Sequence, residues 1–305
     1  MIRQLFSLVL GINVFAGVSF GATPPTGKYK VIVEKMHALQ AQYPGFATIF
    51  TIGENDEGTE LLAMRVSTTP GAPDPKKVGH MVVGTHHGNE SACPPFTAHF
   101  AEQLLKRYAS DELFRGNTLA DTEWTIIPVL NVTGYNSNNR QEYGRDPNRD
   151  YPSVCNNLPG GQLKSIRAFM AHLKTRTYTE SLTVHGYVGS LTYPWGVDAD
   201  DVHTKDHNQF EQITKKAAAI NGYRYGTSTD IVYPADNTYE DYAYAQHGMW
   251  SLLLEMRSGS ASDIDLTTQA SFAYFDQLDA SPSLKNQFTG NCTRGSRKLP
   301  DLHLE

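Results

Sequence analysis

Short runs of apolar and β-branched residues alternate along the chain with longer segments in which apolar positions recur three and four residues apart. The short runs are typical of strands, and the longer spacing is typical of amphipathic helices. Strand-like runs cover residues 46–52, 60–66, 80–85, 124–129, 182–185 and 250–255. Helical spacing covers residues 29–39, before a break at Tyr43-Pro44-Gly45, and roughly 96–108, 162–174 and 207–220.

The order of these elements predicts the fold class. The first two strands flank the polar turn 53–58 and predict an antiparallel hairpin. The later strands alternate with helices, as in buried parallel sheets that carry helices on both faces. We therefore expect an α/β fold with a mixed, mostly parallel, twisted central sheet and the hairpin at one edge. No linker interrupts residues 26–285, so residues 22–305 should form a single domain with an irregular tail after about residue 286.

The N-terminal residues differ from the rest of the chain. One positive charge precedes the mostly apolar run Leu5–Phe20, and small residues follow it. This pattern predicts a signal peptide over residues 1–21, cleaved after Gly21 or Ala22. A buried N-terminal helix is the alternative, but Pro24-Pro25 would break it. We expect a secreted or periplasmic protein, because no other stretch is apolar enough to span a membrane.

The charge balance narrows the possible partners. The chain has 26 Lys and Arg against 32 Asp and Glu, a formal net charge of −6, and no basic stripe that could meet a phosphate backbone. We therefore expect no nucleic-acid partner, and we expect a monomer.

Three cysteines allow one disulfide and one free thiol. We expect Cys155 to pair with Cys292, because Cys93 falls at the start of a buried helix. Three free cysteines are the alternative.

A cluster of metal-binding side chains is predicted at the ends of two strands. His87 and Glu90 lie in a turn after the strand 80–85, and His185 ends the strand 182–185. Parallel strands deliver such residues to one edge of the sheet. Imidazole and carboxylate ligands suit zinc, and three protein ligands with an open fourth position are typical of a catalytic zinc site. An exposed turn without a metal is the alternative for the His-x-x-Glu pair.

Further polar residues suggest hydrolysis. Glu255 ends an apolar strand, where a buried acid is costly unless it is used or paired, and it could accept a proton from a metal-bound water. An ion pair with Arg257 is the alternative. The loop 139–150 contains three arginines, which recognise carboxylates and oxyanions.

Taken in order, these motifs resemble the zinc carboxypeptidase A family. The resemblance covers nearly the whole chain after the predicted signal peptide and implies a central sheet of about eight strands. It starts so soon after the cleavage point that we expect no long pro-segment. The matching segments are Tyr43-Pro44, Ile52-Gly53, Glu57-Gly58, His87-x-x-Glu90, Asp146-x-Asn148-Arg149, His185, Tyr193-Pro194-Trp195-Gly196, Tyr233, Asp241 and Glu255-Met256-Arg257.

The resemblance implies a role for each matched residue. One Zn²⁺ per chain would be held by His87, Glu90 and His185, with Asp146 fixing the tautomer of His87. Glu255 would act as general base and then general acid, and Arg140 would stabilise the oxyanion, with Arg145 as its rival. The free carboxylate of a peptide would be bound by Asn148, Arg149 and Tyr233.

Two positions bear on specificity. Asn89 stands where some members of the family have an additional arginine, so one secondary substrate contact is absent. Glu240 falls where the family lines the floor of its side-chain pocket, and an acid there would favour a basic residue. The alternative is that Glu240 faces solvent on a helix over residues 238–246. Thr192 and Ser228 should make the pocket polar.

The leading hypothesis is a zinc metallocarboxypeptidase that removes the last residue of a peptide, with a preference for basic residues. One alternative is a zinc amidase or carboxypeptidase that acts on cell-wall peptides containing diaminopimelate, whose amine would also suit Glu240. A second alternative is an inactive family member that serves as a binding module, although such a protein should have lost the acid or the arginines.

Overall fold

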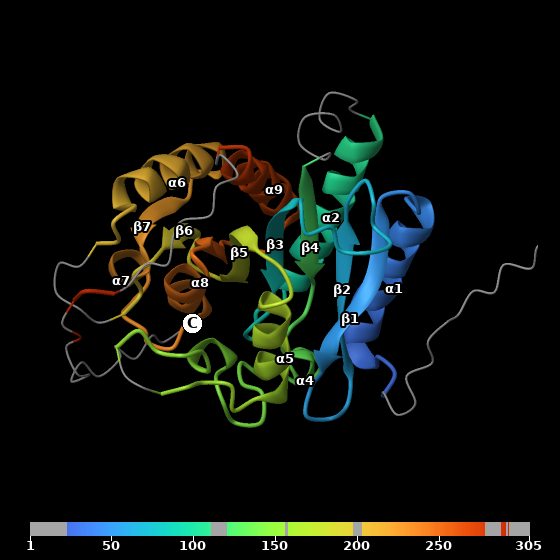
Figure 1. Cartoon of the computed structure of the whole chain (residues 1–305), viewed down its shortest axis with the longest axis horizontal. Coiled ribbons are helices and arrows are strands. Elements are labelled where there is room, and N and C mark those ends of the chain that lie inside the picture. The colour runs from blue at the N-terminus through green and yellow to red at the C-terminus, as the bar shows by residue number, and fades with distance from the viewer. Residues whose placement is uncertain are drawn as a thin grey trace, which may run out of the picture.

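A single sheet runs through the computed structural model, which describes residues 23–110, 121–155, 158–197, 203–277, 288–290 and 292. Within these residues the sheet has eight strands, and helices lie on both of its faces (Figure 1). The strand order is β1-β2-β4-β3-β5-β8-β6-β7. The strands are β1 (Ala47–Glu54), β2 (Glu60–Val66), β3 (Val78–Gly84), β4 (Thr122–Ile127), β5 (Tyr178–Gly186), β6 (Ser190–Tyr193), β7 (Arg224–Thr227) and β8 (Trp250–Met256).

The pairing confirms the predicted mixed sheet. Strands β4, β3, β5 and β8 lie parallel to one another in the centre, and β7 is parallel to β6. The hairpin β1–β2 is antiparallel and forms one edge, as its polar turn predicts, and β6 runs antiparallel to β8. Because the central strands are parallel, their carboxyl ends lie along one edge of the sheet.

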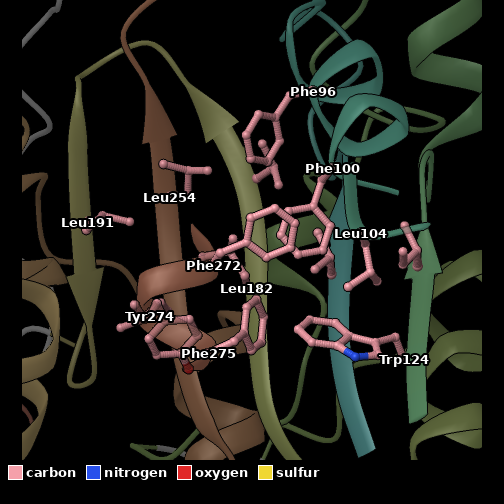
Figure 2. Close-up of a cluster of buried hydrophobic side chains, with 14 of the residues drawn as sticks. Phe96, Phe100, Leu104, Trp124, Leu182, Leu191, Leu254, Phe272, Tyr274 and Phe275 are labelled. Atoms are coloured by element: carbon pink, nitrogen blue, oxygen red, sulfur yellow. The ribbon is translucent and has the colours of Figure 1, made fainter. Parts of the chain in front are cut away.

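The helices bury the two faces of the sheet in separate cores. On one face, α2, α6 and α9 cover the cluster drawn in Figure 2, in which Phe100 and Phe272 stack at 4.7 Å and Leu182 and Leu254 come from the sheet. On the other face, α4, α5 and α8 pack against the sheet, and α1 contributes to both cores at the hairpin end. The helices are α1 (Gly27–Gln42), α2 (Cys93–Ser110), α4 (Val132–Ser137), α5 (Lys164–Leu173), α6 (His207–Asn221), α7 (Ser228–Ile231), α8 (Tyr239–His247) and α9 (Ala261–Phe275), with a 3₁₀ turn, η2, at Pro147–Arg149.

One disulfide joins Cys155 to Cys292, with a Cα–Cα distance of 5.6 Å, and Cys93 is a buried free thiol at the start of α2. The predicted pairing is therefore confirmed. The bond attaches the C-terminal segment to the loop that follows η2. The predicted signal peptide and most of the predicted irregular tail lie outside the described residues.

No helix in the described part of the chain combines the length and the apolar character needed to cross a membrane.

Candidate active site

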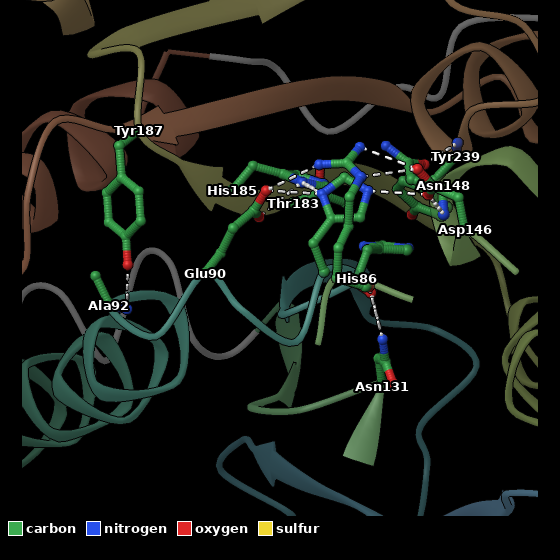
Figure 3. A network of polar contacts seen from close by, with 12 residues as sticks. His86, Glu90, Ala92, Asn131, Asp146, Asn148, Thr183, His185, Tyr187 and Tyr239 are labelled. Carbon is green, nitrogen blue, oxygen red and sulfur yellow. Dashed lines mark hydrogen bonds and ion pairs between the residues drawn. The ribbon is translucent and has the colours of Figure 1, made fainter. Parts of the chain in front are cut away.

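The predicted metal ligands meet at the carboxyl ends of the central strands. His87 and Glu90 lie in the turn between β3 and α2, and His185 lies near the end of β5. Alternation along β5 turns Leu182 and Val184 into one core, so His185 points to the opposite face. Figure 3 shows Glu90 and His185 directed toward each other from these two elements.

The spacing of the ligand atoms fits a tetrahedral zinc ion. Glu90 Oε1 lies 2.7 Å from His87 Nδ1, Glu90 Oε2 lies 3.2 Å from His185 Nδ1, and the two Nδ1 atoms are 3.1 Å apart. Two nitrogens bound to one tetrahedral zinc at about 2.0–2.1 Å would be separated by about 3.3 Å. His87, Glu90 and His185 are the only group of this kind found among the described residues.

The ionised state of Glu90 also favours binding of a cation. Burial alone would raise the pKa of Glu90, but the imidazoles of His87 and His185 lower it to about 2. Burial opposes charge on His185, yet the Glu90 carboxylate raises the pKa of this imidazole. The carboxylate therefore stays ionised in a buried position, where a metal cation would compensate its charge.

Asp146 fixes the orientation of His87. Its Oδ1 lies 3.0 Å from His87 Nε2, so this ring nitrogen donates a hydrogen bond and leaves the Nδ1 lone pair for a metal. Its Oδ2 accepts from Arg140 Nε and Nη2, both at 3.0 Å. Burial would raise the pKa of Asp146, but the hydrogen bond from His87 and the nearby arginines hold it well below its usual range.

The turn that carries His87 is held by backbone contacts. The carbonyls of Gly84 and Thr85 accept from Leu130 N at 3.1 Å and Asn131 N at 3.0 Å. Thr85 has φ of 59°, which is rare for a β-branched residue and costs of order 1–3 kcal/mol. Gly88 packs so tightly on α4 that an added Cβ would lie 2.0 Å from the carbonyl carbon of Gly134. The surrounding structure therefore imposes the conformation that brings His87 to Glu90.

His86 supports the cluster from behind. Its ring stacks on His185 at 5.4 Å, and its Nε2 lies 2.8 Å from the hydroxyl of Tyr151. Complete burial lowers the pKa of His86 well below its usual range, so the ring is neutral. These contacts give His86 a structural role beside His185.

Glu255 lies beside His185 because the parallel register of β5 and β8 pairs the two residues. Glu255 is 8% exposed, and among the described residues its buried Oε2 has no hydrogen-bond partner. Burial raises the pKa of Glu255 to about 7, although His185 opposes the shift. The alternative of an ion pair with Arg257 finds no support in the described residues, because Arg257 stacks on the ring of Tyr223 at 4.8 Å.

The two candidate oxyanion arginines are placed differently. Arg140 Nη1 lies 3.6 Å from Glu90 Oε1, so its guanidinium faces the metal ligands. Arg145 is exposed in the loop before η2. The structure therefore brings Arg140 into the site and leaves Arg145 outside it.

The predicted carboxylate-binding residues also meet. Arg149 Nη2 donates to the hydroxyl of Tyr233 at 3.1 Å, although 84 positions separate the two residues. Asn148 is buried beside them, and its Oδ1 accepts from Tyr239 N at 2.8 Å. Figure 3 shows Asn148 and Tyr239 next to Asp146.

A single pocket joins these groups. Its lining is His87, Asn148, Arg149, His185, Gly196, Ser228, Val232, Tyr233, Ala235, Thr238, Glu240, Leu253 and Glu255. Of the two residues predicted to make it polar, Ser228 lines it, and Thr192 lies behind with its Oγ1 2.9 Å from Ser228 Oγ.

Glu240 is buried in this pocket, with 2% of its surface exposed, rather than facing solvent on α8. Its Oε1 accepts a hydrogen bond from Thr183 Oγ1, and its Oε2 lies 3.4 Å from Asn148 Nδ2. Both partners are uncharged. Thr183, which the sequence analysis did not single out, lies two residues before His185 on β5 and therefore on the same face of the strand.

Comparison with known proteins agrees with this geometry. A family model described as zinc carboxypeptidase matches residues 32–274. The chain belongs to the zinc carboxypeptidase family. Membership makes it a metallopeptidase of the hydrolase class, and the family depends on zinc.

The relatives are distant in sequence and similar in fold. Carboxypeptidase O from Bos taurus is 24% identical over 269 residues, covering 76% of this chain and 69% of the relative. Carboxypeptidase D from Homo sapiens is 23% identical over 224 residues, covering 68% of this chain and only 16% of the relative. The structure of bovine thrombin-activatable fibrinolysis inhibitor matches with a TM-score of 0.65 and 18% identity, covering 81% of this chain and 93% of that one.

The tight packing of Gly88 generates a prediction. Gly88→Ala should force the turn away from α4, lower the free energy of unfolding by about 1–3 kcal/mol and reduce bound zinc. Gly71→Ala is the control, because an added Cβ there meets nothing within 4 Å. Metal analysis and thermal unfolding of the two variants measure the difference. Equal zinc content in both would show that the turn does not depend on this contact.

Proposed function

We propose that the protein is a zinc metallocarboxypeptidase that hydrolyses the C-terminal peptide bond of peptides and prefers basic terminal residues. The observation that supports this proposal is one pocket whose lining includes His87 and His185 of the candidate metal site, Glu255 with its raised pKa, and the pair Arg149 and Tyr233. One zinc ion per chain is the cofactor that this ligand set would hold.

Glu255 is proposed as the general base and acid. Bound zinc would polarise the scissile carbonyl and make the attacking water more acidic. Glu255 takes the proton from that water and later delivers it to the leaving amine. Its pKa of about 7 suits both steps, because the group can accept and release a proton near neutral pH. Arg140, held by Asp146, donates hydrogen bonds to the developing oxyanion.

The proposed carboxylate clamp makes the enzyme an exopeptidase. Arg149 offers a charged, planar donor group, and Tyr233 adds a hydroxyl next to it. Asn148 lines the same pocket and is the third residue of the proposed clamp. Only a chain end places a carboxylate one residue beyond the bond that is cut, so internal bonds should be poor substrates.

Glu240 supports the basic preference. Its carboxylate is buried, and the two hydrogen-bond donors that hold it carry no charge. A Lys or Arg side chain of the substrate would bring the missing positive charge to this end of the pocket. The hydroxyls of Ser228 and Thr238 line the same pocket, and Thr238 Oγ1 has no hydrogen-bond partner among the described residues.

These hydroxyls also favour a second candidate function. Diaminopimelate carries both an ammonium and a carboxylate at its side-chain end, so a cell-wall peptide could use Glu240 for the first and the hydroxyls for the second. We further infer that residues 1–21 are a signal peptide and that the mature protein acts as a secreted or periplasmic monomer.

The role of Glu255 predicts that Glu255→Gln retains zinc and loses turnover. The amide cannot accept the proton from water, so kcat should fall by about 10²–10⁴-fold. Peptide hydrolysis and zinc content should be measured on the same preparation. Glu211→Gln, an exposed change on α6, is the control and should keep full activity. A Glu255→Gln variant with normal kcat would refute the assignment.

The clamp and the pocket predict separate changes in specificity. In peptides that differ only in the last residue, Arg149→Ala should raise KM about 10- to 100-fold for every free chain end. Glu240→Gln should raise KM by a similar factor for peptides that end in Lys or Arg. It should leave KM unchanged for peptides that end in Leu or Phe. Mass spectrometry of the trimmed peptides separates the two effects. An unchanged Lys-to-Leu ratio in Glu240→Gln would exclude Glu240 as the specificity residue. Cleavage of diaminopimelate peptides alone would favour the second candidate.

A further inference from the structure

The two halves of the proposed carboxylate clamp come from separate segments. Arg149 lies in the clamp loop, which we define as residues 146–155 and which includes η2. Tyr233 lies in the Tyr233 loop, residues 232–238, between α7 and α8. Contact between the two side chains therefore requires that the two loops be held in a fixed relation.

A polar link joins the loops away from the pocket. Ser153 Oγ lies 2.7 Å from both carboxylate oxygens of Asp236, and the same carboxylate accepts from Asn237 N at 2.7 Å. Asn237 exchanges two further hydrogen bonds with Tyr151, from Tyr151 N to Asn237 O at 3.1 Å and from Asn237 Nδ2 to Tyr151 O at 2.6 Å. Asn237 has φ of 59°, a conformation that Asn tolerates better than most residues.

Ser153 also connects this link to the disulfide. Ser153 Oγ also accepts from Cys155 N at 2.9 Å, and Cys155 is bonded to Cys292. Near Cys292, Phe288 packs edge-on against Trp195 at 5.2 Å. Next to Trp195, the carbonyl of Gly196 accepts from Ala235 N in the Tyr233 loop at 2.6 Å. The clamp loop, the Tyr233 loop and the C-terminal segment are thus tied together on the outer side of the pocket.

We propose that Asp236, through Ser153 and Asn237, is a positioning residue that holds the hydroxyl of Tyr233 against Arg149 before substrate arrives. The inference rests on the proposed clamp. Asp236 is not among the residues that line the pocket, so it acts through the loop that carries Tyr233. Ordering two loops costs conformational entropy, and a link made in advance spares substrate binding that cost.

Loss of the link through Asp236 should affect substrate binding rather than the chemical step. Without the link, the Tyr233 loop would have to be ordered by the substrate itself, so KM should rise. His185 and Glu255 lie on β5 and β8, and His87 and Glu90 lie in the turn after β3, so none of these residues lies in the two loops that Asp236 and Ser153 join. The value of kcat should therefore change little.

The test is a double-mutant cycle on the full-length, zinc-loaded protein, with peptides that have a free chain end. Asp236→Ala should raise KM about 5- to 30-fold with kcat within twofold of the parent protein. Asp236→Asn keeps a carbonyl oxygen that can accept from Ser153 Oγ, so it should restore most of the loss. In a Tyr233→Phe background, Asp236→Ala should raise KM by less than twofold, because the hydroxyl that it positions is already absent.

Ser153→Ala removes the hydroxyl that bonds to Asp236 and so breaks the same link from the other loop. It should raise KM in the same way, but by a smaller factor. Ser137→Ala is its control, because within the described part of the chain Ser137 Oγ bonds only to backbone carbonyls of its own helix α4. Unchanged KM in both Asp236→Ala and Ser153→Ala would overturn the inference. So would a double variant, Asp236→Ala with Tyr233→Phe, whose rise in KM equals the product of the rises in the two single variants. Loss of kcat together with thermal stability in both variants would also overturn it, since that indicates general damage. If Arg149→Ala leaves KM unchanged, the proposed clamp itself fails.

Discussion

The carboxylate of Asp146 is the contact on which the rest of the site depends. One oxygen accepts from His87 Nε2, and the other accepts from two nitrogens of Arg140. The first oxygen also accepts from the backbone N–H of Asn148, at 2.9 Å. One side chain thereby fixes the tautomer of a metal ligand, the direction of the proposed oxyanion arginine and the start of the clamp loop. Because all three contacts share one carboxylate, Asp146 joins the candidate metal site to Asn148 in the clamp loop.

The sheet supplies the other constraint. In parallel strands side chains alternate between faces, and register decides which of them become neighbours across strands. The register of β5 and β8 pairs His185 with Glu255, and alternation turns Thr183 and Leu253 to the same side. The proposed base therefore lies next to a metal ligand without any loop to position it. The residues proposed to select the substrate come instead from loops and from α8, where hydrogen bonds rather than strand geometry hold them.

Much of this arrangement could be predicted from the sequence because it follows from local patterns. The strands of the central sheet have β-rich runs, and the ligands stand at the ends of those runs. Strands β6 and β7 were missed because each has only four residues, too few for a pattern to show. Helix α9 was missed because it is rich in Ser, Thr and Asp, although Ser260 and Asp263 provide a recognisable start, with Ser260 Oγ accepting from Asp263 N at 3.3 Å.

The link through Asp236 could not be predicted, since it depends on hydrogen bonds between segments that are far apart in the chain. The proposed chemistry requires that one zinc ion be held by Nδ1 of His87, the Glu90 carboxylate and Nδ1 of His185. Anomalous X-ray diffraction on either side of the zinc absorption edge would locate the metal. We expect one strong peak within about 2.0–2.2 Å of these three groups, with His87 Nε2 still bonded to Asp146. A peak elsewhere, or zinc bound through His87 Nε2, would contradict it.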